Sequence, residues 1–333
     1  MPRSKRIDIV GGVYHVIVRG IERKGIFKDD TDRKEFLSRF ANSLYKTKSK
    51  CFAWVLMSNH IHLMLRTGIN SLSDVMRGLL TGYAIFFNKR HKRHGYLYQN
   101  RYKSVLCQED IYFRELVRYI HLNPARAQIV NDINGLDNYL WCGHSTVIGK
   151  HKNKWQDVDG VLVWFGQKRN EAIEGYKEFI ERGIGEKSAI DFSGGGLIRS
   201  VGGWSNLTHL RKSDKYQKAD ERILGDDEFV NKVLREAEEK IDRQELLIRQ
   251  GWNLEKLAER VCGIFDISVS DLQKKGKANA ISQAKMLFCY WGHNELGASG
   301  KQVGEYLGIS RPAVCKNIVK GAELKERKHR LIN

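Results

Sequence analysis

The chain has 333 residues, with 57 Lys and Arg against 39 Asp and Glu, and a formal net charge of +18 at pH 7. This length allows two domains, or one domain with an appendage. The positive charge indicates a polyanionic partner such as nucleic acid. The alternative interpretation is a soluble protein that is basic without binding such a partner. No apolar run approaches the ~20 residues of a spanning helix, and residues 2–12 hold no signal-peptide core. We therefore expect a cytoplasmic, nucleoid-associated protein with no membrane partner.

The first 150 residues alternate short apolar strands with amphipathic helices. The alternation of apolar side chains predicts strands at residues 12–18, 51–57 and 60–66. Helical periodicity predicts helices at residues 30–45, with Thr31 as its cap, at 71–88, and at 110–123, where Pro124 stops the last one. Strands interleaved with helices on one sheet indicate an α+β fold.

The rest of the chain reads as helical. Residues 150–185 are mostly polar, with a few apolar residues that can pack against a core. The glycines at residues 193–203 predict a flexible linker. Residues 226–249 predict a long charged helix. The six scattered cysteines form no Cys-x-x-Cys pair, which indicates reduced thiols without a zinc knuckle. We expect three parts, at residues 1–150, 151–251 and 252–325.

His60 and His62 lie on the predicted strand at residues 60–66. Side chains alternate along a strand, so both imidazoles point to one face, while Ile61, Leu63 and Leu65 point to the other. Two imidazoles on an otherwise apolar strand are costly unless satisfied, and a divalent metal is a natural partner. The alternative is a structural pair that hydrogen-bonds to backbone or solvent.

Tyr119 and Asn123 stand four residues apart on the last predicted helix of this region, and hence on one face. A metal held by two histidines and an amide oxygen, with a tyrosine beside it, suits phosphodiester chemistry. Tyr119 could instead be an aromatic at the edge of the apolar stripe. His15 lies on a strand near these residues, where a packing role is expected, and His121 is one candidate general base beside a metal-bound water.

These motifs carry a family resemblance. The pair His60-x-His62, followed by Tyr119 in a Tyr-Ile-x-x-Asn-Pro-x-x-Ala context, resembles the single-tyrosine HUH transposases, most closely the REP-associated tyrosine transposases. Further similar segments are residues 14–20, 26–30, 54–59, 95–104 and 124–127. The resemblance implies a ferredoxin-like sheet, a Tyr119 that attacks a DNA phosphate to give a 5′-phosphotyrosine, and Asn123 as the third metal ligand. An oxygen-containing site favours Mg²⁺ or Mn²⁺.

Residues 75–108 contain no Asp or Glu. Cations bind phosphates and aromatic rings stack on unpaired bases, so this segment is expected to bind single-stranded or hairpin DNA. A solvated basic loop is the alternative. The expected DNA contacts are Arg77, Lys89, Arg90, Lys92, Arg93, Tyr98, Arg101 and Lys103, with Tyr96 and Tyr102 interleaved.

Residues 300–318 have the pattern of a helix-turn-helix, in which Gly308 permits the turn, Ser310 caps and Pro312 fits the first helical turn. Arg311, Lys316, Asn317 and Lys320 are expected to face duplex DNA. The region from residue 261 onward resembles the C-terminal DNA-binding domain of the initiator DnaA, but has Ser-Arg-Pro-Ala in place of Asp-His-Ser-Thr. A purely structural helical appendage is the alternative.

The sequence therefore predicts a metal-dependent transposase that cleaves and rejoins single-stranded or hairpin DNA, as a monomer or homodimer. The alternative is a non-catalytic, sequence-specific DNA-binding regulator derived from such an enzyme. A zinc hydrolase that uses His60 and His62 is a third interpretation. Only the transposase needs both histidines together with Tyr119.

Overall fold

The computed structural model describes residues 7–68, 70–185, 220, 222–274 and 280–328. The chain divides into two compact units, Met1–Val233 and Leu234–Asn333. The predicted glycine linker at residues 193–203 lies outside the described residues. Among the described helices, none combines the length and the apolar character that crossing a bilayer requires.

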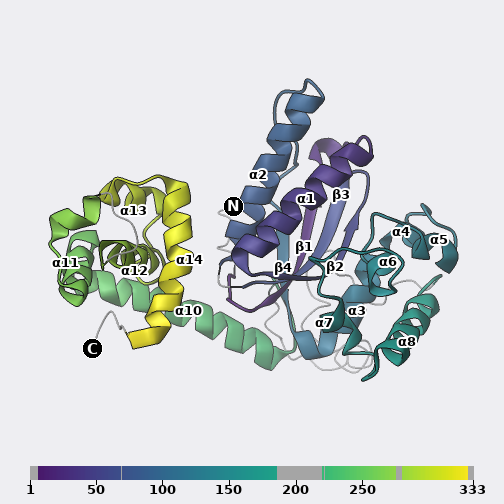
Figure 1. Cartoon of the computed structure of the whole chain (residues 1–333). Helices are drawn as coiled ribbons and strands as arrows, with labels where there is room; N and C mark the ends of the chain where they lie inside the picture. The colour runs from purple at the N-terminus through teal and green to yellow at the C-terminus, as the bar shows by residue number, and fades with distance from the viewer. Residues whose placement is uncertain (1–6, 69, 186–219, 221, 275–279, 329–333) are drawn as a thin grey trace. The chain divides into compact units, whose positions relative to one another are not determined.

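A five-stranded sheet forms the centre of the first unit (Figure 1). Its strands are β1 (Val13–Arg19), β2 (Lys50–Leu56), β3 (His60–Arg66), β4 (Lys103–Cys107) and β5 (Ile223–Leu224). They lie in the order β2-β3-β1-β4-β5, with the first four antiparallel and β5 parallel to β4. With α1 (Asp30–Thr47) between β1 and β2, and α2 (Leu72–Arg90) between β3 and β4, this is the predicted ferredoxin-like arrangement.

Helices cover both faces of this sheet. Helices α1 and α2 pack side by side on one face, whereas α3 (Glu109–His121) packs against β2 and β3 on the other (Figure 1). Because side chains alternate along β3, His60, His62 and Met64 point toward α3. We call this side the α3 face.

The helix starts follow local capping chemistry. Helix α1 begins after Asp29, whose side chain accepts a hydrogen bond from the Asp32 amide, so the predicted cap Thr31 is wrong. Thr31 lies two residues after the cap, inside the first turn. Helix α2 begins after Ser71, whose side chain accepts from the Asp74 amide, as the sequence predicts.

The end of α3 differs from the prediction. The helix stops at His121, and Asn123 opens the short helix α4 (Asn123–Arg126) instead of ending α3. Pro124 has no backbone N–H for the carbonyl of Ile120, which leaves that acceptor without its usual helical donor. The Asn123 side-chain amide compensates, since Nδ2 donates to the carbonyls of Tyr119 (2.8 Å) and Ile120 (3.3 Å).

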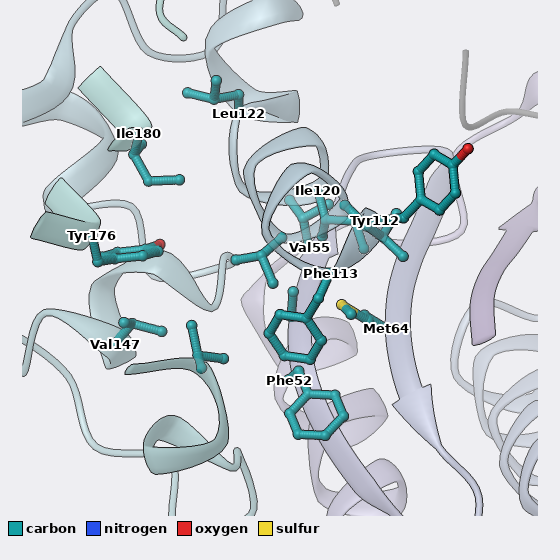
Figure 2. Close-up of a cluster of buried hydrophobic side chains, with 14 of the residues drawn as sticks. Phe52, Val55, Met64, Tyr112, Phe113, Ile120, Leu122, Val147, Tyr176 and Ile180 are labelled. Carbon is teal, nitrogen blue, oxygen red and sulfur yellow. The ribbon is translucent and has the colours of Figure 1, made fainter. Parts of the chain in front are cut away.

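Four more helices enlarge the core on the α3 face: α5 (Ile133–Asp137), α6 (His144–Val147), α7 (Val158–Leu162) and α8 (Arg169–Arg182). Figure 2 shows Tyr176 and Ile180 of α8 in the cluster that also holds Phe113 and Ile120 of α3. Helices α7 and α8, predicted as part of an extension at residues 151–251, therefore share the core of the sheet.

The second unit is all-helical, as predicted. It contains α11 (Leu254–Phe265), the 3₁₀ helix η2 (Val269–Gln273), α12 (Ala280–Asn294), α13 (Gly300–Leu307) and α14 (Arg311–Lys328). The long helix α10 (Asp227–Arg249) crosses the boundary between the units, and its Leu247 belongs to the second core. Phe288 and Trp291 of α12 are the largest buried side chains of this core.

Candidate active site

The two histidines of β3 come together on the α3 face next to β1. His60 pairs with Arg19 and His62 pairs with Ile17 across the ladder. Their ring centroids lie 5.1 Å apart, with the ring planes at 84°. The period-two reading of residues 60–66 is therefore confirmed.

Each imidazole is held at Nδ1 by a neighbour. Asn59 Nδ2 donates to the carbonyl of Arg23 (2.9 Å), which fixes the amide so that Oδ1 accepts from His60 Nδ1 (2.7 Å). His62 Nδ1 lies 2.9 Å from Nε2 of His15, and His15 itself is buried. These contacts leave Nε2 of both rings as the nitrogen for an external ligand, the usual arrangement around metal-binding histidines.

Both imidazoles are kept neutral. Burial, followed by the charge of Arg19, lowers the pKa of His60 to about 4. Burial also lowers the pKa of His62 well below its usual value, with smaller contributions from His15 and His60. A neutral imidazole offers a lone pair, so both residues can bind a cation near neutral pH without first losing a proton.

Tyr119 of α3 faces this pair. Its half-buried ring meets the rings of His15 and His62 edge to face, with centroids 5.8 Å apart in each case. The Arg126 guanidinium lies 5.1 Å from the Tyr119 ring centroid, and Arg126 Nη1 donates to the Tyr119 carbonyl (3.3 Å). The break between α3 and α4 thus fixes Tyr119 through Asn123 and Arg126.

The side chains of His60, His62, Tyr119 and Asn123 line one pocket of about 470 Å³. The cations Arg19, Arg101 and Lys103 suit a phosphate-bearing ligand. The full lining is Ile17, Arg19, His60, His62, Gln99, Asn100, Arg101, Lys103, Tyr119 and Asn123.

Gln99 and Asn100 are pocket residues that the sequence did not single out. Pairing of the preceding chain with the end of β1 places them there, because Ile21 N donates to the Leu97 carbonyl and Gln99 N to the Arg19 carbonyl (3.0 Å each). No periodicity in residues 95–101 signals this pairing.

The pocket fits a metal with mixed nitrogen and oxygen ligands. Within the described part of the chain, no cluster of three or more His, Cys, Asp or Glu side chains could hold a metal. A site here would therefore combine His60 and His62 with a neutral oxygen. Asn123 offers its Oδ1, since its Nδ2 is committed to α3.

The cations at residues 75–108 that are expected to contact DNA have three kinds of surroundings. Arg101 and Lys103 line the pocket, while Lys89 and Lys92 are exposed. The others are engaged within the protein: Arg90 with Asp29 (2.7 Å) and Asp32 (2.6 Å), Arg77 with Asp74, and Arg93 with Asn88 (2.8 Å).

Tyr98 does not present its phenol to solvent. Its hydroxyl is buried and, among the described residues, has no hydrogen-bond partner, and burial raises its pKa. Tyr102 is also buried, whereas Tyr96 is 83% exposed. The residue as a whole is partly exposed, so a DNA contact by Tyr98 stays a prediction, but its hydroxyl is not the group that makes it.

His121 is excluded as a base for Tyr119. It lies two residues further along α3, hence on a different face, and is fully buried. Its Nδ1 donates to the Tyr176 hydroxyl (2.7 Å), which donates to His144 Nδ1 (2.8 Å), while His144 Nε2 donates to Asp137 (2.8 Å). Burial, followed by the charge of His144, lowers the pKa of His121 well below its usual value.

The second unit has the predicted turn. Gly308 ends α13 in the left-handed conformation (φ 63°), and α14 begins at Arg311. Arg311 and Lys316 are exposed, but the Asn317 side chain hydrogen-bonds to Cys289 of α12. Asn317 is partly exposed, and its role as a DNA contact stays a prediction.

The comparison with protein families concerns the first unit. Residues 9–123 match the family model described as "Transposase IS200 like". This segment is similar to IS200-like transposases. This match confirms the resemblance to single-tyrosine transposases over residues 9–123, and every residue that lines the pocket falls inside it. It does not extend to the C-terminal region, whose resemblance to DnaA stays a prediction.

No curated protein matches the chain. A solved structure described as "Structure of the REP associates tyrosine transposase bound to a REP hairpin" is 18% identical to it. The similarity covers 46% of this chain and 89% of that chain, with a TM-score of 0.38.

Proposed function

We propose that this protein cleaves and rejoins single-stranded or hairpin DNA in a transposition reaction, with Tyr119 as the nucleophile. The observation that carries the proposal is the meeting of Tyr119, His60 and His62 in one cation-lined pocket. The match of residues 9–123 to IS200-like transposases supports it.

The pocket is suited to Mg²⁺ or Mn²⁺, with His60, His62 and Asn123 as its protein ligands. Such an ion, when bound, would polarise the phosphoryl oxygens and offset the charge of the transition state. Asn59 and His15 orient the two imidazoles through their Nδ1 atoms. Arg101 and Lys103 add positive charge for the DNA backbone.

In the chemical step, the phenol oxygen of Tyr119 forms a bond to phosphorus while the bond from phosphorus to the 3′ oxygen breaks. The phenol proton, with a usual pKa of about 10, must leave during the attack, and the departing 3′ oxygen ends as a hydroxyl. The 5′-phosphotyrosine keeps the energy of the broken bond. A 3′-hydroxyl can therefore reverse the step and rejoin the strand without ATP.

Arg126 supports this chemistry from outside the pocket lining. Its guanidinium lies over the Tyr119 ring, where a positive charge favours the negative charge that develops on the phenol oxygen. Asn123 caps the carbonyl of the same tyrosine. Both contacts restrict the orientation of Tyr119 before DNA binds.

A second proposal concerns the C-terminal unit, which would bind duplex DNA next to the cleaved strand. The turn at Gly308 and the exposed Arg311, Lys316 and Lys320 of α14 support it. A helix-turn-helix inserts its second helix into the major groove, which an unpaired strand does not offer.

The experiment incubates the protein with labelled hairpin DNA and Mn²⁺ or Mg²⁺, and then resolves covalent adducts on a denaturing gel. Wild type should form an adduct, Tyr119→Phe should form none, and the exposed Tyr45→Phe should behave as wild type. A persistent adduct with Tyr119→Phe would remove Tyr119 as the nucleophile. DNA binding without any adduct would favour the non-catalytic regulator.

A further inference from the structure

Tyr96 is the exposed aromatic residue of the basic segment between α2 and β4, with 83% of its surface open to solvent. Single exposed apolar side chains are common on proteins and need no explanation. The backbone that carries Tyr96, however, is organised by a set of specific contacts, and its surroundings are positively charged.

The loop at residues 88–96 is built around Asn88 and Arg93. Asn88 Oδ1 accepts from Arg93 Nη1 (2.8 Å), and Asn88 Nδ2 donates to the Gly95 carbonyl (2.9 Å). Arg93 Nη2 donates to the Tyr96 carbonyl (3.2 Å), and the guanidinium lies 5.9 Å from the Phe87 ring centroid. Gly95 has φ 87°, a conformation that glycine adopts without strain. The loop is therefore held in one shape while the Tyr96 ring points away from it.

Exposed cations precede Tyr96 in the same segment, since Lys89 and Lys92 are both open to solvent. Lys92 has φ 49°, an uncommon conformation for a residue with a side chain, which indicates a loop held by its surroundings. An exposed ring among cations is the combination that binds an unpaired nucleotide, because the ring stacks on the base and the cations attract the phosphates.

The position along the chain places Tyr96 near the site. Gln99, which lines the pocket, follows three residues later, so their Cα atoms lie at most about 11 Å apart. A strand rises about 3.4 Å per nucleotide when its bases are stacked. A base on Tyr96 would thus lie within a few nucleotides of the phosphate in the pocket.

We propose that Tyr96 is a stacking platform for an unpaired base of the DNA strand that enters the pocket. The position of the stacked base relative to a cleaved phosphate rests on the proposed function. The stacking of a base on Tyr96 does not. The ligand is single-stranded DNA or the unpaired part of a hairpin, and the contact is sequence-tolerant because every base has an aromatic face.

The test measures the binding of the full-length protein to fluorescein-labelled oligothymidylate, which cannot pair with itself, and to a blunt duplex. Chelator in the buffer prevents cleavage. Tyr96→Leu should weaken binding of the single strand by about 5- to 100-fold, as expected for one stacked base, and Tyr96→Trp should restore it. The matched control is Tyr45→Leu, since Tyr45 is 87% exposed on α1.

Unchanged binding of oligothymidylate by Tyr96→Leu would overturn the proposal, as would an equal loss on the blunt duplex. The same variants are then assayed for adducts with Mn²⁺. If wild type binds through Tyr96 but forms no adduct, the proposed function fails and the stacking site stands. If wild type forms adducts and Tyr96→Leu binds normally, only the stacking site fails.

Discussion

At the scale of single residues, the site depends on contacts that a sequence pattern shows only in part. Alternation along residues 60–66 was sufficient to place His60 and His62 on one face. The contact of His15 with His62 depends on the pairing of β1 with β3, which no local pattern states. The burial of the Tyr98 hydroxyl and of His121 also depends on packing partners distant in the sequence, so the neighbours of these residues did not reveal it.

Replacement of either histidine should separate cleavage from binding. His60→Ala or His62→Ala should reduce adduct formation by at least about 100-fold, because an ion that offsets phosphate charge contributes several kcal/mol. Affinity for DNA should change little, since the basic side chains remain. Asn123→Ala should reduce adduct formation less than either histidine variant does, because water can replace one neutral metal ligand.

The readouts for these variants are the rate of adduct formation and DNA binding by fluorescence anisotropy. The exposed His94→Ala provides a control for the loss of an imidazole outside the pocket. Cleavage at the wild-type rate by both His60→Ala and His62→Ala would show that the metal site is wrong.

At the scale of elements, the C-terminal end of α3, which carries Tyr119, is held by Asn123 at the start of α4 and by Tyr176 of α8. The sequence predicts the stop at Pro124, but not that Asn123 would cap the carbonyls freed there. It also predicts helical residues after 150, but not that Tyr176 of α8 would join His121 and His144 inside the core. Neither contact follows from local propensity, because each depends on how separate elements pack.

Tyr176→Phe tests this interior contact. The change leaves Nδ1 of His121 and of His144 without the hydroxyl that joins them, and buried polar atoms without partners cost about 1–3 kcal/mol each. Because two such atoms are left, we expect the free energy of unfolding in urea to fall by about 2–6 kcal/mol. Tyr45→Phe, on the surface of α1, should leave it unchanged. Equal stability of Tyr176→Phe and Tyr45→Phe would show that the hydroxyl contributes nothing.

At the scale of the whole molecule, the chain contains a cation-lined pocket in its first unit and a helical second unit with exposed basic residues on α14. The order of β1, α1, β2, β3, α2 and α3 followed from hydrophobic patterns. The strands β4 and β5 were not predicted. Strand β5 has only two residues, which carry no pattern, and its pairing with Leu106 and Cys107 defines it. Val230 and Val233 at the start of α10 are buried in the first unit and extend it beyond the predicted boundary.

This boundary changes how the second unit should be removed. A chain that ends at residue 240 keeps β5 and the buried start of α10, and should still form adducts with a short hairpin. It should bind long duplex-flanked targets more weakly and with a shallower salt dependence, since fewer phosphates are contacted. A chain that ends at residue 185 lacks β5 and should be less stable. Equal affinity and salt dependence for the 240-residue and full-length chains would rule out DNA binding by the second unit.

The central claim, that Tyr119 becomes linked to DNA, is tested most directly by locating the link. Trypsin cuts after Arg118 and Arg126, which releases residues 119–126 as a peptide whose one tyrosine is Tyr119. After reaction with hairpin DNA and Mn²⁺ and digestion of the DNA by nuclease, mass spectrometry should find this peptide with a phosphate or nucleotide on its tyrosine. The same modification on another tyrosine, with the 119–126 peptide unmodified, would contradict the account.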